Sequence, residues 1–167
     1  MQGFAGARRL PGTLGLRIVM DLFVFSSANL TNVWAGVGSR SWAVSLTQAE
    51  NASIQGRAKN LQVGSLGIFY CVEEKCLTTP FMVSSRPRAG EFVTNIWPEK
   101  WALPFGIQPL GSPHKRVAVS ALRDLLPSLK DGKAWSSLLH VAPGIAFAAS
   151  DISREDWAAL VSALAQA

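Results

Sequence analysis

Two apolar segments joined by a short charged turn constrain the fold of this chain more than any other feature. Leu66–Val72 and Leu77–Ser84 are rich in β-branched and aromatic residues, and the turn between them contains Glu73, Glu74 and Lys75. Such a pattern is typical of a β-hairpin. The proline at position 80 cannot donate a hydrogen bond to a neighbouring strand, so the sequence predicts a sheet edge or a bulge there.

The rest of the chain adds extended and helical segments in mixed order. Extended segments are expected at Ile18–Phe25, Trp42–Ser45 and Leu103–Leu110, and helices at Thr47–Leu61, at Ser120–Leu129 and at a final segment capped by Ser150 or Ser153. With 49% hydrophobic and only 16% charged residues, the chain can form a substantial core. The pattern favours a single α+β domain over residues 18–167, built on a curved or barrel-like mixed sheet with short flanking helices.

Residues 1–17 differ from the remainder, because they contain several arginines and glycines and no acidic residue. The sequence therefore predicts a flexible N-terminal extension. A transit peptide, a vector remnant and an upstream start codon are equally compatible with it. No segment reaches the ~20 apolar residues that a membrane span requires, so we expect a cytoplasmic protein that does not enter a membrane.

Tryptophan is unusually frequent, with six Trp against one Tyr. Trp34 and Trp42 flank residues 36–40, Gly-Val-Gly-Ser-Arg, which the sequence predicts to be a glycine-rich turn. An indole ring is a strong stacking surface for a nucleobase, and base readers place an extruded base between aromatic rings. The pattern therefore indicates an aromatic base-binding pocket, although either tryptophan could instead belong to the core.

These residues also carry a resemblance to a known family. Trp34-x-Gly36-Val37 followed by Arg40, and Val63-Gly64-Ser65 leading into Ile68-Phe69-Tyr70, resemble the EVE domain, a relative of the YTH and PUA modules that read modified bases. The resemblance spans roughly residues 20–130 and implies a PUA-like fold. Ser65 replaces the acid that is common in the EVE turn, and Cys71 stands where a His is common, so the identity of the base stays open.

The resemblance implies non-catalytic recognition of a methylated or hydroxymethylated cytosine, or of N6-methyladenine. It also implies modified DNA rather than RNA, and a nuclease or motor partner, fused or in trans, in a modification-dependent restriction system. In YTH relatives a second aromatic residue follows the central strands, where this chain has Trp97. The residues expected to bind the base are Trp34, Gly36, Val37, Ser39, Trp42, Asn60, Trp97 and Trp101.

The net charge of +5 is compatible with a polyanionic partner. Lysine and arginine contacts to phosphate position a nucleic acid without reading its sequence. The residues expected to make such contacts are Arg40, Arg57, Arg86, Arg88, Lys115 and Arg116, and the densest clusters are Arg86-Pro-Arg88 and Lys115-Arg116.

The sequence lacks the motifs of the common catalytic and cofactor sites. It contains no G-x-S-x-G, no phosphate-binding loop, no C-x-x-C and no histidine spacing typical of zinc. We therefore expect a protein that is not an enzyme and uses no cofactor or metal. Two alternatives remain open, namely a binder of small molecules or nucleotide metabolites and a protein–protein adaptor with a Trp-rich surface.

Overall fold

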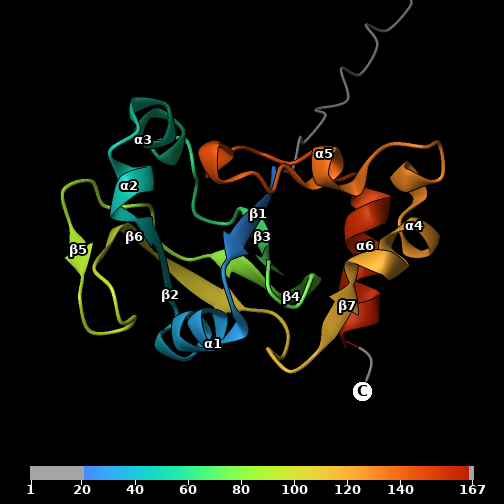
Figure 1. Cartoon of the computed structure of the whole chain (residues 1–167), viewed down its shortest axis with the longest axis horizontal. Coiled ribbons are helices and arrows are strands. Elements are labelled where there is room, and N and C mark those ends of the chain that lie inside the picture. Colours follow the sequence, from blue (N-terminus) through green and yellow to red (C-terminus); the bar gives the residue numbers. More distant parts are fainter. Residues whose placement is uncertain (1–20, 166–167) are drawn as a thin grey trace, which may run out of the picture.

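A curled sheet forms the centre of the molecule, whose computed structural model describes residues 21–165. The strands follow the order β1-β3-β4-β6-β2 and curl into a half-barrel (Figure 1). They are β1 (Leu22–Ser27), β3 (Leu66–Cys71), β4 (Cys76–Val83), β6 (Trp101–Pro109) and β2 (Ser41–Ser45), with β5 (Phe92–Val93) beside β6 and β7 (Arg116–Ala118) beside β4. β1 and β3 are parallel, and the other pairs are antiparallel. The predicted α+β domain on a curved sheet is confirmed, whereas the prediction for residues 1–17 lies outside the described residues.

Short helices flank the sheet on two sides (Figure 1). They are α1 (Leu30–Ser39), α2 (Leu46–Ala49), α3 (Ala52–Ala58), α4 (Leu122–Leu125), α5 (Trp135–Leu139) and α6 (Arg154–Ala165), with 3-10 turns at Val119–Ala121, Pro127–Leu129 and Pro143–Ile145. The helix expected over Thr47–Leu61 is divided, because the Asn51 side chain accepts from the backbone of Ser53 and Ile54 and starts α3 anew. No helix among the described residues is long and apolar enough to cross a membrane.

The start of α6 agrees with the sequence-based prediction. The backbone N–H of Asp156 donates to Ser153 Oγ at 3.1 Å, and Asp156 Oδ2 accepts from the backbone N–H of Ser153 at 3.0 Å. This reciprocal arrangement satisfies two of the N–H groups that a helix leaves free at its first turn. Ser153 is therefore the residue that caps α6. The sequence had predicted either Ser150 or Ser153 at this position.

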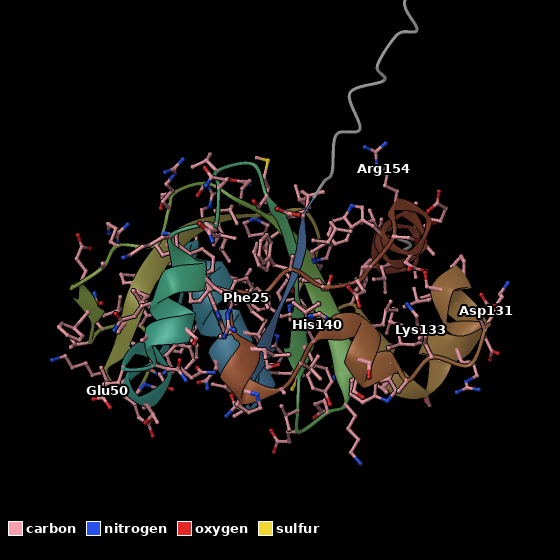
Figure 2. All side chains as sticks on the ribbon, turned by 90° about the horizontal axis from the view of Figure 1, so that it is seen from above. Phe25, Glu50, Asp131, Lys133, His140 and Arg154 are labelled. Carbon is pink, nitrogen blue, oxygen red and sulfur yellow. The ribbon has the colours of Figure 1, made fainter. Side chains whose placement is uncertain are left out.

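The two faces of the sheet contact two separate cores. In β1, Phe23 and Phe25 point into the curl, while Leu22 and Val24 point outward. The inner core also receives α1 and α3, and the outer core is covered by α4, α5 and α6. Figure 2 shows Phe25 in this interior, with Glu50 and Asp131 at the periphery. The alternation follows from the two-residue period of a strand.

Pro80 lies inside β4, at the position where this strand changes its partner. β4 pairs with β7 over Cys76–Thr78 and with β6 over Phe81–Val83. The register with β3 shifts at the same place, and Thr79 has a φ of 45°. The predicted bulge is therefore confirmed, whereas the alternative of an edge strand is wrong.

The segment predicted as a glycine-rich turn is the second half of helix α1, so this prediction was wrong. Asn29 caps the helix, because its Oδ1 accepts from the backbone N–H of Asn32 at 2.9 Å. Leu30, Val33 and Gly36 are buried at helical spacing, and Arg40 ends the helix with a φ of 51°. Glycine costs a helix about 1 kcal/mol per residue, and the packing of the buried face outweighs that cost here.

Candidate functional site

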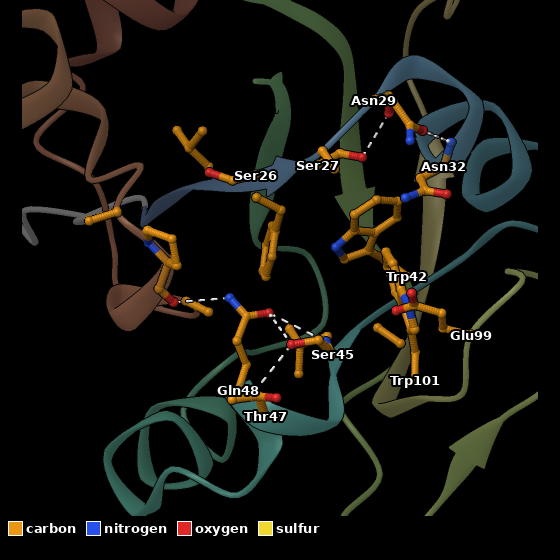
Figure 3. A pocket seen from close by; sticks show the side chains of 18 of the residues that line it. Ser26, Ser27, Asn29, Asn32, Trp42, Ser45, Thr47, Gln48, Glu99 and Trp101 are labelled. Carbon is orange, nitrogen blue, oxygen red and sulfur yellow. Dashed lines mark hydrogen bonds between the residues drawn. The ribbon is translucent and has the colours of Figure 1, made fainter. Parts of the chain in front are cut away.

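A cavity of about 600 Å³ lies between β1 and β2, the first and last strands in the order β1-β3-β4-β6-β2. The curl of the sheet brings these strands to face each other, so the cavity occupies the place where a complete barrel would close (Figure 3). Its wall is formed by residues 24–29, Asn32, residues 42–45, Thr47, Gln48, Pro98, Glu99, Trp101, His140, Ala142, Pro143 and Ala146. Concave sites with a few placed polar groups are the usual form of a ligand site.

Three tryptophans meet at one end of the cavity in a corner arrangement. Trp97 and Trp101 are stacked, with ring centroids 4.3 Å apart and planes at 10°. Trp42 stands at 86° to both rings. Trp97 therefore covers one face of the half-buried Trp101, whose side chain lines the cavity, and the perpendicular Trp42 cannot form a sandwich with it. The expected sandwich of a base between two parallel rings is not the geometry of this corner.

Trp42 contributes to the cavity wall although only 1% of its surface is exposed. Its ring lies 4.4 Å from that of Phe69 and packs against the backbone of α1. A Cβ at Gly36 would lie 2.6 Å from Cε3 of Trp42, so only glycine admits the ring at this distance. The glycine that sequence analysis assigned to base contact therefore supports Trp42 from behind.

Asn32 presents an amide to the cavity from a fixed backbone. Its N–H donates to Asn29 Oδ1, and its carbonyl accepts from Nε1 of Trp97 at 3.0 Å. Its side-chain amide lines the cavity and makes no hydrogen bond with any residue in the described part of the chain. A carboxamide offers both donors and an acceptor, which suits the edge of a nucleobase.

The opposite wall of the cavity is a segment that we call the strap, residues 140–149. Ser26 Oγ donates to the Val141 carbonyl and Gln48 Nε2 to the Pro143 carbonyl, each at 2.9 Å. Arg57 donates from Nη2 and Nε to two further strap carbonyls, those of residues 144 and 146, at 2.7 and 3.0 Å. Side chains from β1, α2 and α3 thus hold the strap in place.

The residues expected to bind a base fall into three groups. Trp42 and Trp101 line the cavity, and Trp97 supports Trp101 from behind. Gly36 is buried against Trp42, and Val37 packs on the inner core. Trp34, Ser39 and Asn60 do not line the cavity.

The position of Trp34 explains why its spacing from Trp42 in the sequence did not predict a shared pocket. Trp34 follows Asn32 by two residues, about 200° around a helix, so the two side chains point in different directions. The Trp34 ring is 44% exposed and lies 5.7 Å from that of His114, and its N–H donates to the Pro113 carbonyl at 3.3 Å. Ser39 donates within its own helix to the Ala35 carbonyl at 2.7 Å.

The residues expected to contact phosphate do not form one cluster. Arg116 pairs in register with Thr78 at the start of β4, whereas Arg86 and Arg88 follow the end of the same strand. Several of these side chains already contact other groups of the protein. Arg88 pairs with Glu91, Arg116 with Glu74, Arg86 with Gln62, Lys115 with the Ala165 carbonyl, Arg57 with the strap, and Arg40 ends α1.

The titratable groups near the cavity are few. Among the lining residues only Glu99 and His140 have acidic or basic side chains, and His140 Nε2 lies 3.4 Å from Asp151 Oδ2. Cys71 and Cys76 face each other across β3 and β4 as buried free thiols. Burial, together with the Cys71 thiol, raises the pKa of Cys76 to about 11, which keeps its sulfur protonated. The described residues contain no group of three or more His, Cys, Asp or Glu suited to a metal.

Several cavity residues were missed by sequence reasoning. Asn29 and Asn32 were not among the predicted site residues, although an asparagine shortly after a strand is the signature of a helix cap. That signature locates the start of α1, and with it the amide at the cavity. The sequence of the strap, in contrast, contains no pattern that would predict its position at the cavity.

Comparison with known proteins gives a likeness of fold. No family model and no curated protein matches the sequence. The YTH domain of the Zygosaccharomyces rouxii MRB1 protein, solved in complex with N6-methyladenosine RNA, matches with a TM-score of 0.59 and 15% identity, over 95% of this chain and 92% of that one.

Two further YTH domains give similar values. The Pho92 YTH domain in complex with m6A has a TM-score of 0.60 at 15% identity, over 95% of this chain and 94% of that chain. The Mmi1 YTH domain in complex with RNA has a TM-score of 0.52 at 12% identity, over 96% and 93%. The chain therefore has a YTH-like fold, which is related to the expected PUA-like architecture, and membership of the EVE family itself stays a prediction.

Proposed function

We propose that this chain binds a modified base of a nucleic acid in the cavity between β1 and β2, without transforming it. The observation that carries the proposal is that Trp101, stacked on Trp97 through one face, lines the same cavity as the unengaged amide of Asn32. Stacking on an aromatic ring holds a base, and a carboxamide reads its edge. Solved structures of this fold contain N6-methyladenosine RNA, which supports the same type of ligand here.

N6-methyladenine in RNA is the ligand that we place first. A buried methyl group adds apolar contact of about 0.8 kcal/mol, and stacking on one aromatic residue contributes roughly 1–3 kcal/mol. An apolar pocket that gains one methyl group discriminates about tenfold to a hundredfold. Methylated or hydroxymethylated cytosine, modified DNA and a nuclease or motor partner remain predictions from the EVE resemblance.

Binding without turnover is part of the proposal. Glu99 and His140 are the ionisable residues of the wall, and neither is paired with a nucleophile there. His140 instead contacts Asp151, outside the lining residues. Covalent catalysis needs a nucleophile within hydrogen-bond reach of the base that activates it, and the lining residues hold no such pair.

Fluorescence anisotropy with short labelled single strands tests the proposal. The strands carry N6-methyladenine, 5-methylcytosine or 5-hydroxymethylcytosine at one position, in RNA and in DNA, beside unmodified strands at the same salt concentration. We expect about tenfold or greater preference for N6-methyladenine RNA. Equal affinity for modified and unmodified strands would refute the reader function, and release of free base or cleaved strand would refute the absence of turnover.

Two tryptophan substitutions provide a matched pair for the same assay. Trp101→Ala removes the stacking face and should weaken binding about tenfold or more. Trp34→Ala removes an equally large ring from the outside of α1, away from the cavity, and should leave affinity within about a factor of two. If both variants lost affinity equally, the cavity would not be the binding site.

A further inference from the structure

The indole N–H of Trp42 lacks a partner, although the ring is almost completely buried. Trp34 and Trp97 donate their indole N–H groups to backbone carbonyls. Trp42 makes no such bond with any described residue. Among the described residues no fully buried side-chain nitrogen or oxygen is without a partner, so the small exposed part of Trp42 includes this nitrogen. The space that Trp42 borders is the cavity.

The packing of the ring fixes which edge of Trp42 meets that space. The Cε3–Cζ3 edge lies against Gly36, where a Cβ would be 2.6 and 2.9 Å away. In an indole, Nε1 is on the opposite side from Cε3, so the N–H is directed away from α1. Phe69 covers the ring at 4.4 Å. Figure 3 shows the indole nitrogen of Trp42 directed toward the interior of the cavity.

Perpendicular rings allow stacking and hydrogen bonding on one ligand. A base stacked on Trp101 lies parallel to that ring and therefore perpendicular to Trp42, whose plane is at 86° to Trp101. Two perpendicular planes share a line, along which an N–H in one plane can meet a lone pair in the other. A buried indole N–H usually has a hydrogen-bond acceptor, and here the ligand would supply it.

We infer that Trp42 determines specificity by donating a hydrogen bond from Nε1 to an acceptor atom in the ring edge of the bound base. This inference rests on the proposed function and narrows its ligand class. The base must present an unprotonated ring nitrogen or a carbonyl oxygen to Trp42. A base whose corresponding atom carries a proton or a methyl group leaves the buried N–H unpaired and is rejected.

Atom-by-atom replacement in the ligand tests this inference on the wild-type protein. RNA strands carry N6-methyladenine or its 1-deaza, 3-deaza or 7-deaza analogue, each of which replaces one ring nitrogen by C–H. We expect one analogue to lose affinity by about five- to fiftyfold because the donor is left without an acceptor. Equal affinity for the parent base and all three analogues would overturn the inference.

A variant series then assigns any lost hydrogen bond to Trp42. Trp42→Phe keeps an aromatic ring and removes the N–H, so the penalty of the sensitive analogue should disappear in this variant. Trp101→Phe, the matched control, keeps its stacking face and should retain the full penalty. An unchanged penalty in a folded Trp42→Phe protein that still prefers the modified base would overturn the role of Trp42 and leave the proposed function intact. Failure of the wild-type protein to bind any modified strand would overturn both.

Discussion

Replacing Gly36 by alanine should damage the aromatic corner from behind. The new Cβ would lie 2.6 Å from Cε3 of Trp42 and 2.9 Å from the Ser41 carbonyl oxygen, whereas ordinary contacts of a Cβ are 3.4–4 Å. Trp42 cannot move freely because it packs against Phe69, Trp97 and Trp101. Overpacking of this kind costs about 1–3 kcal/mol.

Gly38 provides the matched control in the same helix. A Cβ at this position meets nothing within 4 Å. Both substitutions gain the same helix propensity, about 0.8–1 kcal/mol, so the difference between Gly36→Ala and Gly38→Ala isolates the clash. We expect Gly36→Ala to be less stable than Gly38→Ala by roughly 1–3 kcal/mol.

Urea unfolding followed by tryptophan fluorescence measures this difference, provided the slopes of the two variants agree. The anisotropy assay on the same proteins should show weaker binding of the modified strand by Gly36→Ala alone, because its displaced Trp42 no longer faces the ligand. Equal stability of the two variants would refute the argument that the ring requires a glycine.

Two further predictions concern the strap and α6. Arg57→Lys should lower the free energy of unfolding by about 0.5–1.5 kcal/mol and speed hydrogen exchange in the strap. The reason is that one ammonium group cannot replace a guanidinium that donates to two carbonyls. The control Arg86→Lys, at an exposed position, should change neither quantity. Burial raises the pKa of Asp156, but hydrogen bonds from Ser128 and Ser153 outweigh it and hold the pKa below its ordinary value. The ionised Asp156 therefore stabilises the fold above about pH 4, and this contribution is lost as the pH falls below that value. Urea unfolding of the wild type and of Asp156→Asn at several pH values measures the effect. The difference in the free energy of unfolding between the two proteins should become smaller as the pH falls through that range.

Local patterns in the sequence predicted the strands well. The hairpin of β3 and β4 and the extended segment of β6 were predicted because apolar alternation and a charged turn are properties of neighbouring residues. Helix α1 was missed, because glycines at positions 36 and 38 lower local helix propensity while the gain from burial is tertiary. One of these glycines is there to admit the Trp42 ring, a requirement set by a residue in another element.

The candidate site was predicted only in part because its wall is assembled from distant segments. Trp42 and Trp101 belong to paired strands, and the strap lies about a hundred residues beyond β2 in the sequence. Tryptophan content alone could not separate Trp42 from Trp34. Trp34 lies on the outer side of α1, whereas Trp42 lies in β2 and is buried against that helix, and only the fold reveals this difference. Likewise, the basic residues contact acids and carbonyls whose positions are set by the fold.

The angle between the rings determines how such a site would discriminate between ligands. Stacking on Trp101 tolerates any base, because every base has an aromatic face. A sandwich between parallel rings would add affinity of the same unselective kind, but Trp42 stands at 86° and offers an edge. In the proposed site, discrimination between bases would then come from hydrogen bonds of Asn32 and Trp42 at the rim of the base, beside the apolar contact of the methyl group. A site that can hydrogen-bond a ligand edge rejects analogues lacking the matching atom more strongly than an apolar pocket rejects a missing methyl group. Changes at the ring edge should therefore alter affinity more than changes in the size of the base.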